Sequence, residues 1–372
     1  MKKGVIYIYT FMNPEVIGEG TYGCVTKPSI HCKDKSVDYD NKVSKIMLRD
    51  DARKEYDGMK ELSKHKNINK YIIPQPEICK PLITDVFHDT VKKCENEDFP
   101  ETKDEDFLIL VLDDGGVSLR TLTDVFFDTF TAHEAHVFLS KIHHLMKGLL
   151  YFNQKGIVHH DIAARNVVYN VKTGVIRFID FGLLKHAETI IKECKQSKNK
   201  FAKYWKNFPP ENGIANYRKY KNSGFDMDYD LFLKRLVYTF DWFSLGDMMK
   251  SVLRQLYTKT KISTAVFEEL YPFFGKLGER NIQNRDYNIH DMTRLYKDLL
   301  LKHHIWADQP PNPSLRSIHI QESLKNEKSL FPSSSLSVLS ALSKRNVRTK
   351  RGVVRCKKNY KRNKITQKCV RQ

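Results

Sequence analysis

The stretch that decides the fold is His159-His160-Asp161-Ile162-Ala163-Ala164-Arg165-Asn166, followed after a short apolar run by Asp180-Phe181-Gly182. A carboxylate followed five residues later by an amide suits phosphoryl transfer, because the carboxylate accepts a hydroxyl proton while the amide binds a metal ion beside it. The second carboxylate, Asp180, would hold Mg²⁺ against nucleotide phosphates. A bare D-x-x-x-x-N is also common in incidental polar loops, so the interpretation depends on the surrounding sequence.

A glycine-rich segment near the N-terminus runs Gly18-Glu19-Gly20-Thr21-Tyr22-Gly23-Cys24-Val25. Glycines at steps of two and three let a strand–turn–strand lie close over phosphates, with backbone N–H groups directed at the anion. G-x-G-x-x-G alone is equally typical of a plain glycine turn or a dinucleotide-binding turn. The valine two residues after the last glycine favours a flap over ATP, with Val25 covering the adenine.

Hydrophobic periodicity predicts strands before about residue 112 and mostly helices after it. The longest helices expected are residues 51–66, 131–153 and, beyond Asp241, several reaching about Trp306. The predicted strands are Val5–Phe11, Val43–Leu48, Phe107–Leu112, Ile157–Val158, Val167–Tyr169 and Ile176–Ile179.

The order of glycine flap, Lys, Glu, H-x-D-x-x-x-x-N and D-F-G resembles the eukaryotic-type protein kinases. Two further segments agree with this family. Phe208–Glu211, F-P-P-E, lies where an A-P-E motif is expected, and Asp241–Gly246, D-W-F-S-L-G, resembles the D-x-W-S-x-G start of a large helix. The resemblance covers roughly residues 13–306. It implies an α+β bilobal fold: a small, five-stranded antiparallel N-lobe with one helix, a larger helical C-lobe, and ATP between them.

The resemblance also implies a site. Lys45 is preferred over Lys42 as the strand lysine that reaches the α- and β-phosphates, because strand alternation puts it on the same face as Val43. Glu55 is preferred over Glu61 as its partner. The implied catalytic residues are Asp161, Lys45 and Glu55; the Mg²⁺ ligands are Asn166 and Asp180; the ATP-binding residues are Ile17, Gly18, Glu19, Gly20, Thr21, Tyr22, Gly23, Cys24, Val25, Val43, Lys45, Val111 and Asp113, with Leu110 as gatekeeper.

The sequence departs from the family pattern where substrate and regulation are decided. His160 replaces the arginine that usually pairs with an activation-loop phosphate, and a neutral imidazole pairs poorly with a dianion. Ala163 replaces the lysine of serine/threonine kinases, while Arg165 matches the A-A-R of tyrosine kinases. Two segments are longer than usual, with Pro28–Asp40 inserted in the first and extra residues before Asp241 in the second. We expect a serine/threonine protein kinase acting on protein substrates; a tyrosine or dual-specificity kinase, and a pseudokinase or polyanion-binding scaffold, are the alternatives.

The seven cysteines are odd in number, widely spaced and without a C-x-x-C pair. This pattern predicts free thiols in a reducing compartment rather than a zinc or redox site. The start of the chain imitates a signal peptide, but Tyr7, Tyr9 and Thr10 interrupt the apolar run. No apolar run approaches the ~20 residues that a membrane span needs.

Composition divides the chain into four parts: an N-lobe over 1–112, a C-lobe over 113–306, a Pro/Ser-rich linker over 307–343 and a basic tail over 344–372. The tail holds 13 Lys or Arg and no acid, so most of the net charge of +19 belongs to it. It is expected to bind nucleic acid or an acidic partner, or to be a solvated tail. The tail and the flap resemble those of serine/threonine kinases of nucleocytoplasmic large DNA viruses, which implies a location in the host cytoplasm or the virion.

Overall fold

The computed structural model describes residues 13–20, 22–196, 224, 227–285 and 287–306, together with the backbone of 360–362 and 369–371. The chain divides into two compact units, Met1–Pro311 and Asn312–Gln372. In the second unit, β11 (Tyr360–Arg362) pairs antiparallel with β12 (Cys369–Arg371). The strand predicted over Val5–Phe11 lies outside the described residues.

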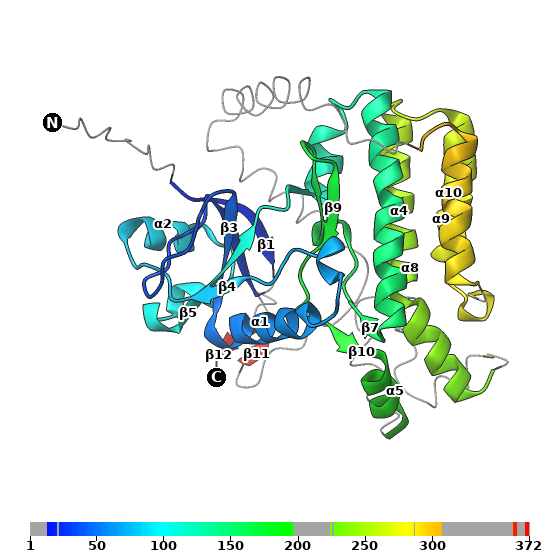
Figure 1. The fold of residues 1–372 in the computed structure, drawn as a ribbon. Helices are drawn as coiled ribbons and strands as arrows, with labels where there is room; N and C mark the ends of the chain where they lie inside the picture. Colours follow the sequence, from blue (N-terminus) through cyan, green and yellow to red (C-terminus); the bar gives the residue numbers. More distant parts are fainter. Residues whose placement is uncertain are drawn as a thin grey trace. The chain divides into compact units, whose positions relative to one another are not determined.

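The first unit begins with a five-stranded antiparallel sheet in the order β1-β2-β3-β5-β4 (Figure 1). Its register places Lys45 between Val25 on β2 and Leu110 on β5. This sheet and the helical lobe that follows confirm the predicted α+β, bilobal fold. The strands are β1 (Glu15–Gly20), β2 (Gly23–Lys27), β3 (Lys42–Leu48), β4 (Glu77–Cys79) and β5 (Phe107–Asp113).

The helix α1 (Arg49–Ser63) covers one face of this sheet. Its buried Ala52 packs with Met47, Leu108 and Leu110 from the two central strands. The helix begins two residues before the predicted start and ends three residues before the predicted end, since Lys64 closes the last turn with backbone N–H bonds to the carbonyls of residues 61 and 62. Its sheet-facing side carries the residues that reach the candidate site.

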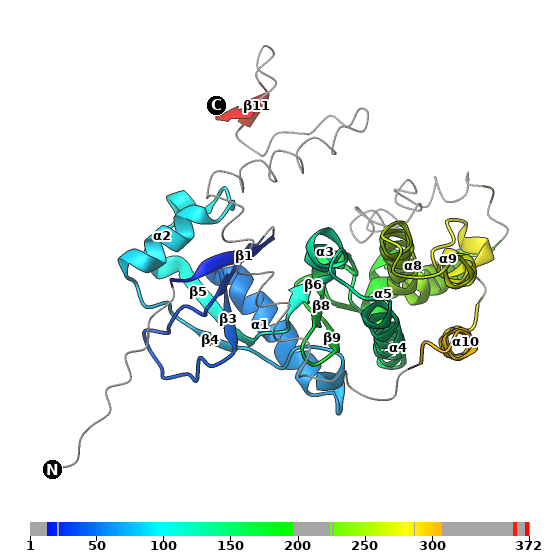
Figure 2. The same cartoon turned by 90° about the horizontal axis from the view of Figure 1, so that it is seen from above.

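An additional helix, α2 (Asp85–Lys93), covers the opposite face (Figure 2). Phe87 on this helix packs with Ile46, Phe107 and Ile109, so both faces of the sheet are buried. The side-chain oxygen of Thr84 caps the helix by accepting the N–H of Phe87. The sheet therefore has two hydrophobic cores, one on each face.

The expectation of free thiols is wrong for four cysteines. Disulfides join Cys24 to Cys94 and Cys32 to Cys79, with Cα separations of 5.9 and 5.7 Å. The inserted loop after β2 and the end of α2 both fold onto the same face of the sheet, which brings together cysteines 70 and 47 residues apart. Cys194 is buried and belongs to neither disulfide. The argument for a reducing compartment loses its support, because disulfides persist mainly in oxidising environments.

The remainder of the first unit is mainly helical. Thr131 and Glu134 form a capping box that starts α4, one residue after the predicted beginning. The long helix α8 begins at Tyr229, well before Asp241, because Asp228 caps its first turn by accepting the N–H of Leu231. The helices are α3 (Leu119–Thr121), α4 (Ala132–Gln154), α5 (Ala187–Gln196), α8 (Tyr229–Thr258), α9 (Thr264–Leu277) and α10 (Ile289–Lys302).

Short strands connect the helical part to the loops of the candidate site. β7 (Ile157–Val158) pairs with β10 (Lys185–His186), and β8 (Val167–Asn170) lies between β6 (Val117–Ser118) and β9 (Val175–Phe178). These pairs lie beside α4 (Figure 1). In the described part of the chain, no helix has both the length and the apolar character required to cross a membrane.

Packing of α8 on the end of α9 predicts that Gly246→Ala destabilises the protein. A Cβ at Gly246 would lie 2.4 Å from the backbone nitrogen of Gly278 and 2.7 Å from the carbonyl oxygen of Phe274, so the helices would have to separate. Overpacking of this kind costs about 1–3 kcal/mol. Urea denaturation should show a lower midpoint.

Gly275→Ala on α9 is the matched control. A Cβ there meets nothing within 4 Å, so the higher helix propensity of alanine should raise stability by up to ~1 kcal/mol. Equal midpoints for Gly246→Ala and the wild type would contradict the close packing of the two helices.

Candidate active site

A buried lysine on the central strand of the N-terminal sheet connects three elements. Lys45 Nζ, on β3, lies 2.6 Å from Glu55 Oε2 on α1 and 3.8 Å from Asp180 Oδ2 in the loop after β9. Lys45 is only 8% exposed and Glu55 6%. Burial alone would lower the pKa of Lys45, but the carboxylates of Glu55 and Asp180 raise it, so the ammonium stays charged.

The two rival residues lie elsewhere. Lys42 is half-buried and forms an ion pair with Asp113, the residue expected at the hinge. Glu61 is exposed and pairs with Lys64 one turn later on its own helix. The structure therefore joins Lys45 to Glu55, as preferred from the sequence, and directs neither rival to Asp180.

Asp180 is held in a defined orientation. Its backbone has a φ of 62°, in the left-handed region, and its Oδ1 accepts the N–H of Gly182 at 3.3 Å. Burial would raise the pKa of this carboxyl, but the charge of Lys45 and the Gly182 hydrogen bond lower it below its usual value. Asp180 is therefore an anion beside a cation, with one oxygen near Lys45.

The glycines of the flap differ in how closely other atoms surround them. A Cβ on Gly23 would lie 2.2 Å from the carbonyl oxygen of Ile46, so packing on β3 demands glycine there. Around Gly18 and Gly20 the nearest atoms stand 3.9 and 3.8 Å from such a Cβ, so the protein itself leaves room. These two glycines keep the space over the sheet open for a ligand. Thr21 lies outside the described residues.

The predicted nucleotide-binding residues divide between the two faces of the sheet. Val25 pairs with Lys45, and Val43 lies two residues before it, so these side chains share the face of Lys45. Cys24 and Val111 belong to the opposite core, under α2. Only the backbone of Cys24 and Val111 is therefore available to a nucleotide.

The flap is also fixed on its outer side. Glu19 pairs with Cys24 in the β1–β2 register, and its Oε1 accepts the N–H of Glu95 at 3.1 Å. The Cys24–Cys94 disulfide lies beside this hydrogen bond. Glu19 therefore interacts with the end of α2, while Ile17 and Tyr22 remain exposed.

The second part of the site is the loop between β7 and β8. Asp161 Oδ2 accepts a hydrogen bond from Asn166 Nδ2 at 2.7 Å, and the same nitrogen donates to the Asp161 carbonyl at 2.8 Å. Arg165 Nη2 donates to both carboxylate oxygens of Asp161, at 2.6 and 2.7 Å. Arg165 and Asn166, four and five residues after Asp161, thus both donate hydrogen bonds to its carboxylate.

A buried carboxylate on α8 anchors this loop. Asp241 accepts the backbone N–H of His159 at 2.7 Å and that of His160 at 3.1 Å. Burial raises the pKa of Asp241, while the two N–H donors and His159 oppose that shift. Sequence reasoning placed Asp241 in a helix-start motif but missed this anchoring role; its position at the head of D-W-F-S-L-G was the available signal.

His159 joins the two loops, a role that sequence reasoning also missed. The Asp161 N–H donates to His159 Nδ1 at 3.3 Å, which leaves Nε2 to donate to the Ile179 carbonyl at 3.1 Å. The imidazole also packs against Phe181, with ring centroids 4.6 Å apart. His159 thereby links Asp161 to the two residues that flank Asp180.

His160 is buried and neutral. Its φ of 68° places it in the left-handed region, and its ring meets Phe240 edge-on at 4.9 Å. Burial lowers its pKa to about 4 despite a backbone hydrogen bond at Leu183. A neutral, buried imidazole cannot replace the arginine as a partner for a phosphate dianion.

The donor set fits a small, hard cation. Asn166 commits its nitrogen to Asp161, which leaves the amide oxygen as the group available to a metal, and Asp180 supplies a carboxylate. Mg²⁺ usually takes one or two protein oxygens and completes its shell with water and phosphates. The described residues contain no cluster of three His, Cys, Asp or Glu suited to a metal, so a cation here would also need nucleotide oxygens.

The fold and these two loops place the chain among the kinases. A model of the protein tyrosine and serine/threonine kinase family matches residues 11–223, more than half of the chain. The chain belongs to this family, and it contains a protein kinase domain. The family implies protein substrates together with ATP and a divalent metal in general. Phe208–Glu211 and the side chains of 344–372 lie outside the described residues, so the roles expected for them stay predictions.

The depressed pKa of His160 predicts part of the acid sensitivity of the fold. An unfolded histidine titrates near ~6.5, whereas this one titrates at about 4. The contribution to stability is therefore present above pH ~6.5 and is lost as the pH falls toward 4, by at most roughly 3 kcal/mol.

His160→Asn removes this titration and tolerates a positive φ. The denaturation midpoint of the variant should fall less steeply than that of the wild type across this pH range. His290→Asn, at an exposed position on α10, is the control and should keep the wild-type slope. Parallel profiles for all three proteins would show that His160 does not titrate as described.

Proposed function

We propose that this protein kinase transfers the γ-phosphate of ATP to serine or threonine hydroxyls of proteins. One observation supports this most directly: Lys45 Nζ lies between Glu55 and Asp180 at the edge of an open glycine flap. A buried, charged lysine beside an ordered carboxylate suits the binding of nucleotide phosphates. The pseudokinase alternative requires a missing lysine, carboxylate or metal ligand, and the described residues supply all of them.

In this proposal, Asp161 accepts the proton of the acceptor hydroxyl. Its carboxylate is oriented by Asn166 and Arg165, so the free lone pairs face a limited region of space. Lys45 binds the α- and β-phosphates, and Glu55 holds the ammonium in place. Asn166 and Asp180 hold Mg²⁺, and bound Mg-ATP supplies the phosphoryl group with part of its charge neutralised. The protein thus contributes positioning and electrostatics.

The flap and the hinge complete the nucleotide site in this proposal. Ile17 and Val25 cover the base from the flap, Val43 lies under it, and the backbone of Val111 and Asp113 supplies polar contacts. Gly18 and Gly20 allow backbone N–H groups to approach the phosphates, because they carry no side chain that would stand between the backbone and the anion.

A tyrosine or dual-specificity kinase is the second candidate function. The bidentate contact of Arg165 with Asp161 favours it, because this arginine belongs to an A-A-R sequence typical of tyrosine kinases. The serine/threonine proposal is supported by the resemblance of Ile17–Val25 to kinases of large DNA viruses. We place the origin of the chain in that group on the same resemblance.

Substitution of either carboxylate tests the mechanism. Asp161→Asn removes the proton acceptor and Asp180→Ala removes a metal ligand. Each should lower kcat about a thousandfold or more, since groups of this kind act as a unit. Labelled ATP and a protein mixture provide the assay, with the denaturation midpoint to show that each variant folds.

The control for both is Asp57→Asn, at an exposed position on α1 remote from the Lys45 contacts. It should keep wild-type turnover. Turnover within a factor of about two of the wild type in Asp161→Asn would remove this residue from the mechanism.

The acceptor type is tested by the products. Incubation with ATP and a protein mixture, followed by mass spectrometry, should give phosphoserine and phosphothreonine in excess of phosphotyrosine. A product map dominated by phosphotyrosine would instead establish the second candidate, with Arg165 directing the acceptor.

The described start of the segment after Asp180-Phe181-Gly182 packs against α8. The helix α5 buries Ile190 and Cys194 against Phe232 and Leu236 of α8. Lys195 Nζ adds an ion pair with Asp230 Oδ2 at 2.6 Å. A neutral His160 is a poor partner for a phosphate. The contacts of α5 with α8 therefore order the start of this segment in its place.

We therefore expect activity without phosphorylation of this segment. Phosphatase treatment, with mass spectrometry confirming that Thr189, Ser197 and Tyr204 are unmodified, should leave turnover unchanged. Thr189 is exposed on α5, so its phosphate is accessible to removal. A large fall in activity that returns on rephosphorylation of one of these residues would show that another cation has taken the role of the missing arginine.

A further inference from the structure

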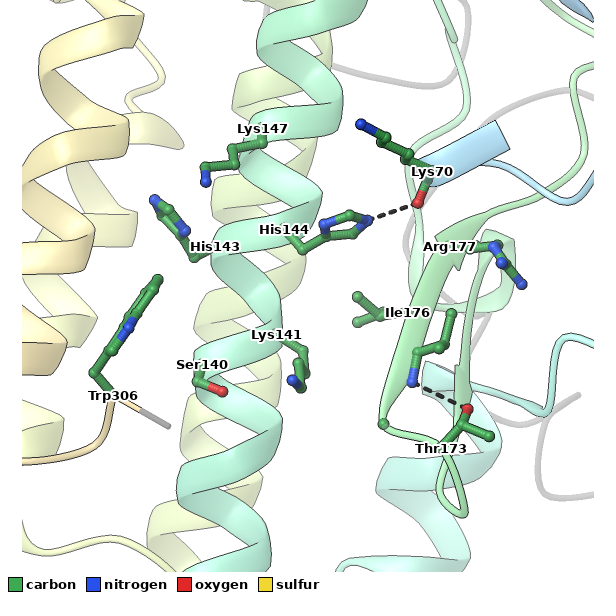
Figure 3. Close-up of a pocket in the computed structure, with 12 residues that line it drawn as sticks. Lys70, Ser140, Lys141, His143, His144, Lys147, Thr173, Ile176, Arg177 and Trp306 are labelled. Carbon is green, nitrogen blue, oxygen red and sulfur yellow. Dashed lines mark hydrogen bonds between the residues drawn. The ribbon is translucent and has the colours of Figure 1, made fainter. Parts of the chain in front are cut away.

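A basic groove crosses α4 on the C-lobe, away from the site described above. Its cavity has a volume of about 470 Å³ and lies between Trp306 on one side and the turn joining β8 to β9 on the other. Figure 3 shows Trp306, His143 and Lys147 on one flank of α4, with His144, Lys70 and Arg177 on the other. The groove shares no lining residue with the Lys45 and Asp161 clusters.

All the Lys, Arg, Asp and Glu residues that line this groove are cations. Lys70, Lys141, Lys147 and Arg177 line it, and no Asp or Glu does. None of these four cations has an ion pair with an acid in the described residues. Like charges in one cavity repel, and they create a positive potential that attracts anions.

The groove is also built by fixed contacts. His144 Nε2 donates to the carbonyl oxygen of Lys70 at 2.6 Å, which joins α4 to the connection between α1 and β4. His143 is buried and meets Trp306 edge-on at 4.9 Å. Burial and nearby cations lower the pKa of both histidines, so they are neutral donors at pH 7.

Arg177 supplies an unsatisfied donor. Its Nε is buried and has no hydrogen-bond partner among the described residues. Arg177 also lines the groove. A carboxylate is a suitable ligand for its guanidinium, because guanidinium groups bind carboxylates in a planar, two-bonded geometry.

We propose that this groove binds an acidic segment of the protein substrate, outside the residues that are phosphorylated. The inference rests on the proposed protein kinase function and adds a substrate class to it. Four cations without acidic partners complement carboxylates, and the partly exposed Trp306 offers apolar surface for the stems of Asp and Glu.

The geometry favours a peptide over a nucleic acid. Single-stranded nucleic acids use exposed aromatic faces on which bases stack. The only tryptophan at the groove, Trp306, has the Lys297 ammonium over its ring at 4.9 Å and His143 against it. A base would have to displace these contacts, whereas carboxylates need only the cations.

Docking at this place would act through local concentration. Arg177 lies on β9, three residues before Asp180. A substrate held by its acidic segment would keep its hydroxyl near Asp161. The groove residues would take no part in the phosphoryl transfer itself. Such tethering raises the effective concentration of the acceptor, so it lowers KM and leaves kcat unchanged.

Binding is measured first, with the full chain and no ATP. The probe is a fluorescein-labelled peptide rich in Glu and Asp and free of Ser, Thr and Tyr. Lys141→Glu with Lys147→Glu should weaken its binding about tenfold or more, since reversing two charges converts attraction to repulsion. The control, Lys60→Glu with Lys234→Glu, reverses two exposed helical lysines and has the same net charge. It should lie within about twofold of the wild type.

Two results would overturn the proposal. Equal weakening in both double variants would mean that net charge or the basic tail attracts the probe. Groove-dependent binding of labelled oligouridylate, tighter than that of the peptide, would assign the groove to nucleic acid. Unchanged denaturation midpoints exclude a loss caused by misfolding.

Kinetics then separate docking from catalysis. A short phosphoacceptor peptide is compared with the same peptide carrying the acidic extension. The groove variant should raise KM about tenfold for the extended peptide only, with kcat unchanged for both. An unchanged KM would overturn the docking role. If peptide binding depends on the groove but no variant or wild type phosphorylates anything, the groove stands as an acidic-peptide site and the proposed kinase function fails.

Discussion

The rest of the structure depends on one buried charge. Lys45 is nearly inaccessible to solvent, and an ammonium in that environment needs a carboxylate within contact distance. Glu55 supplies it from α1 and Asp180 from the loop after β9, so a single cation fixes the helix, the sheet and the second lobe's loop together. Loss of either partner of a buried pair generally costs about 3–5 kcal/mol, because the remaining charge is uncompensated. The contacts with Glu55 and Asp180 that stabilise the ammonium also hold it beside the glycine flap.

A buried carboxylate, Asp241, anchors a loop of the C-lobe, much as buried Lys45 joins elements around the N-lobe sheet. Asp241 fixes two consecutive backbone N–H groups, and His160, between β7 and Asp161, adopts a left-handed conformation that few non-glycine residues take. The strain is localised one residue before Asp161. His159 extends the anchoring to Ile179 and Phe181. Asp161 and Asp180 therefore occupy positions set by the core of α8, not by the loops alone.

Motifs made most of the site predictable, because their spacing fixes local geometry. Asp161 and Asn166 converge through one turn of chain, and alternation along β3 put Lys45 on the correct face. Long-range pairing was not predictable: the distances from Cys24 to Cys94 and from Cys32 to Cys79 depend on where α2 and the inserted loop fold. The direction of Cys24 and Val111 away from the nucleotide face depends on the same extra layer. The anchoring role of Asp241 was not predicted for the same reason, since its partners lie 82 and 81 residues away.

The extra layer changes how the flap is held. In a two-layer N-lobe, the outer face of β1 and β2 would meet solvent, and the glycine-rich turn would be restrained only through β3. Here Phe87 and Phe107 bury that face, the Cys24–Cys94 disulfide ties β2 to the end of α2, and Glu19 accepts the N–H of Glu95. The freedom left to the flap is thus concentrated at Gly18 and Gly20, where a Cβ would meet no atom closer than 3.8 Å, while Gly23 is packed against Ile46. The flap is therefore rigid on the side of α2 and open on the side of Lys45. Such a flap loses little conformational entropy when it closes over phosphates.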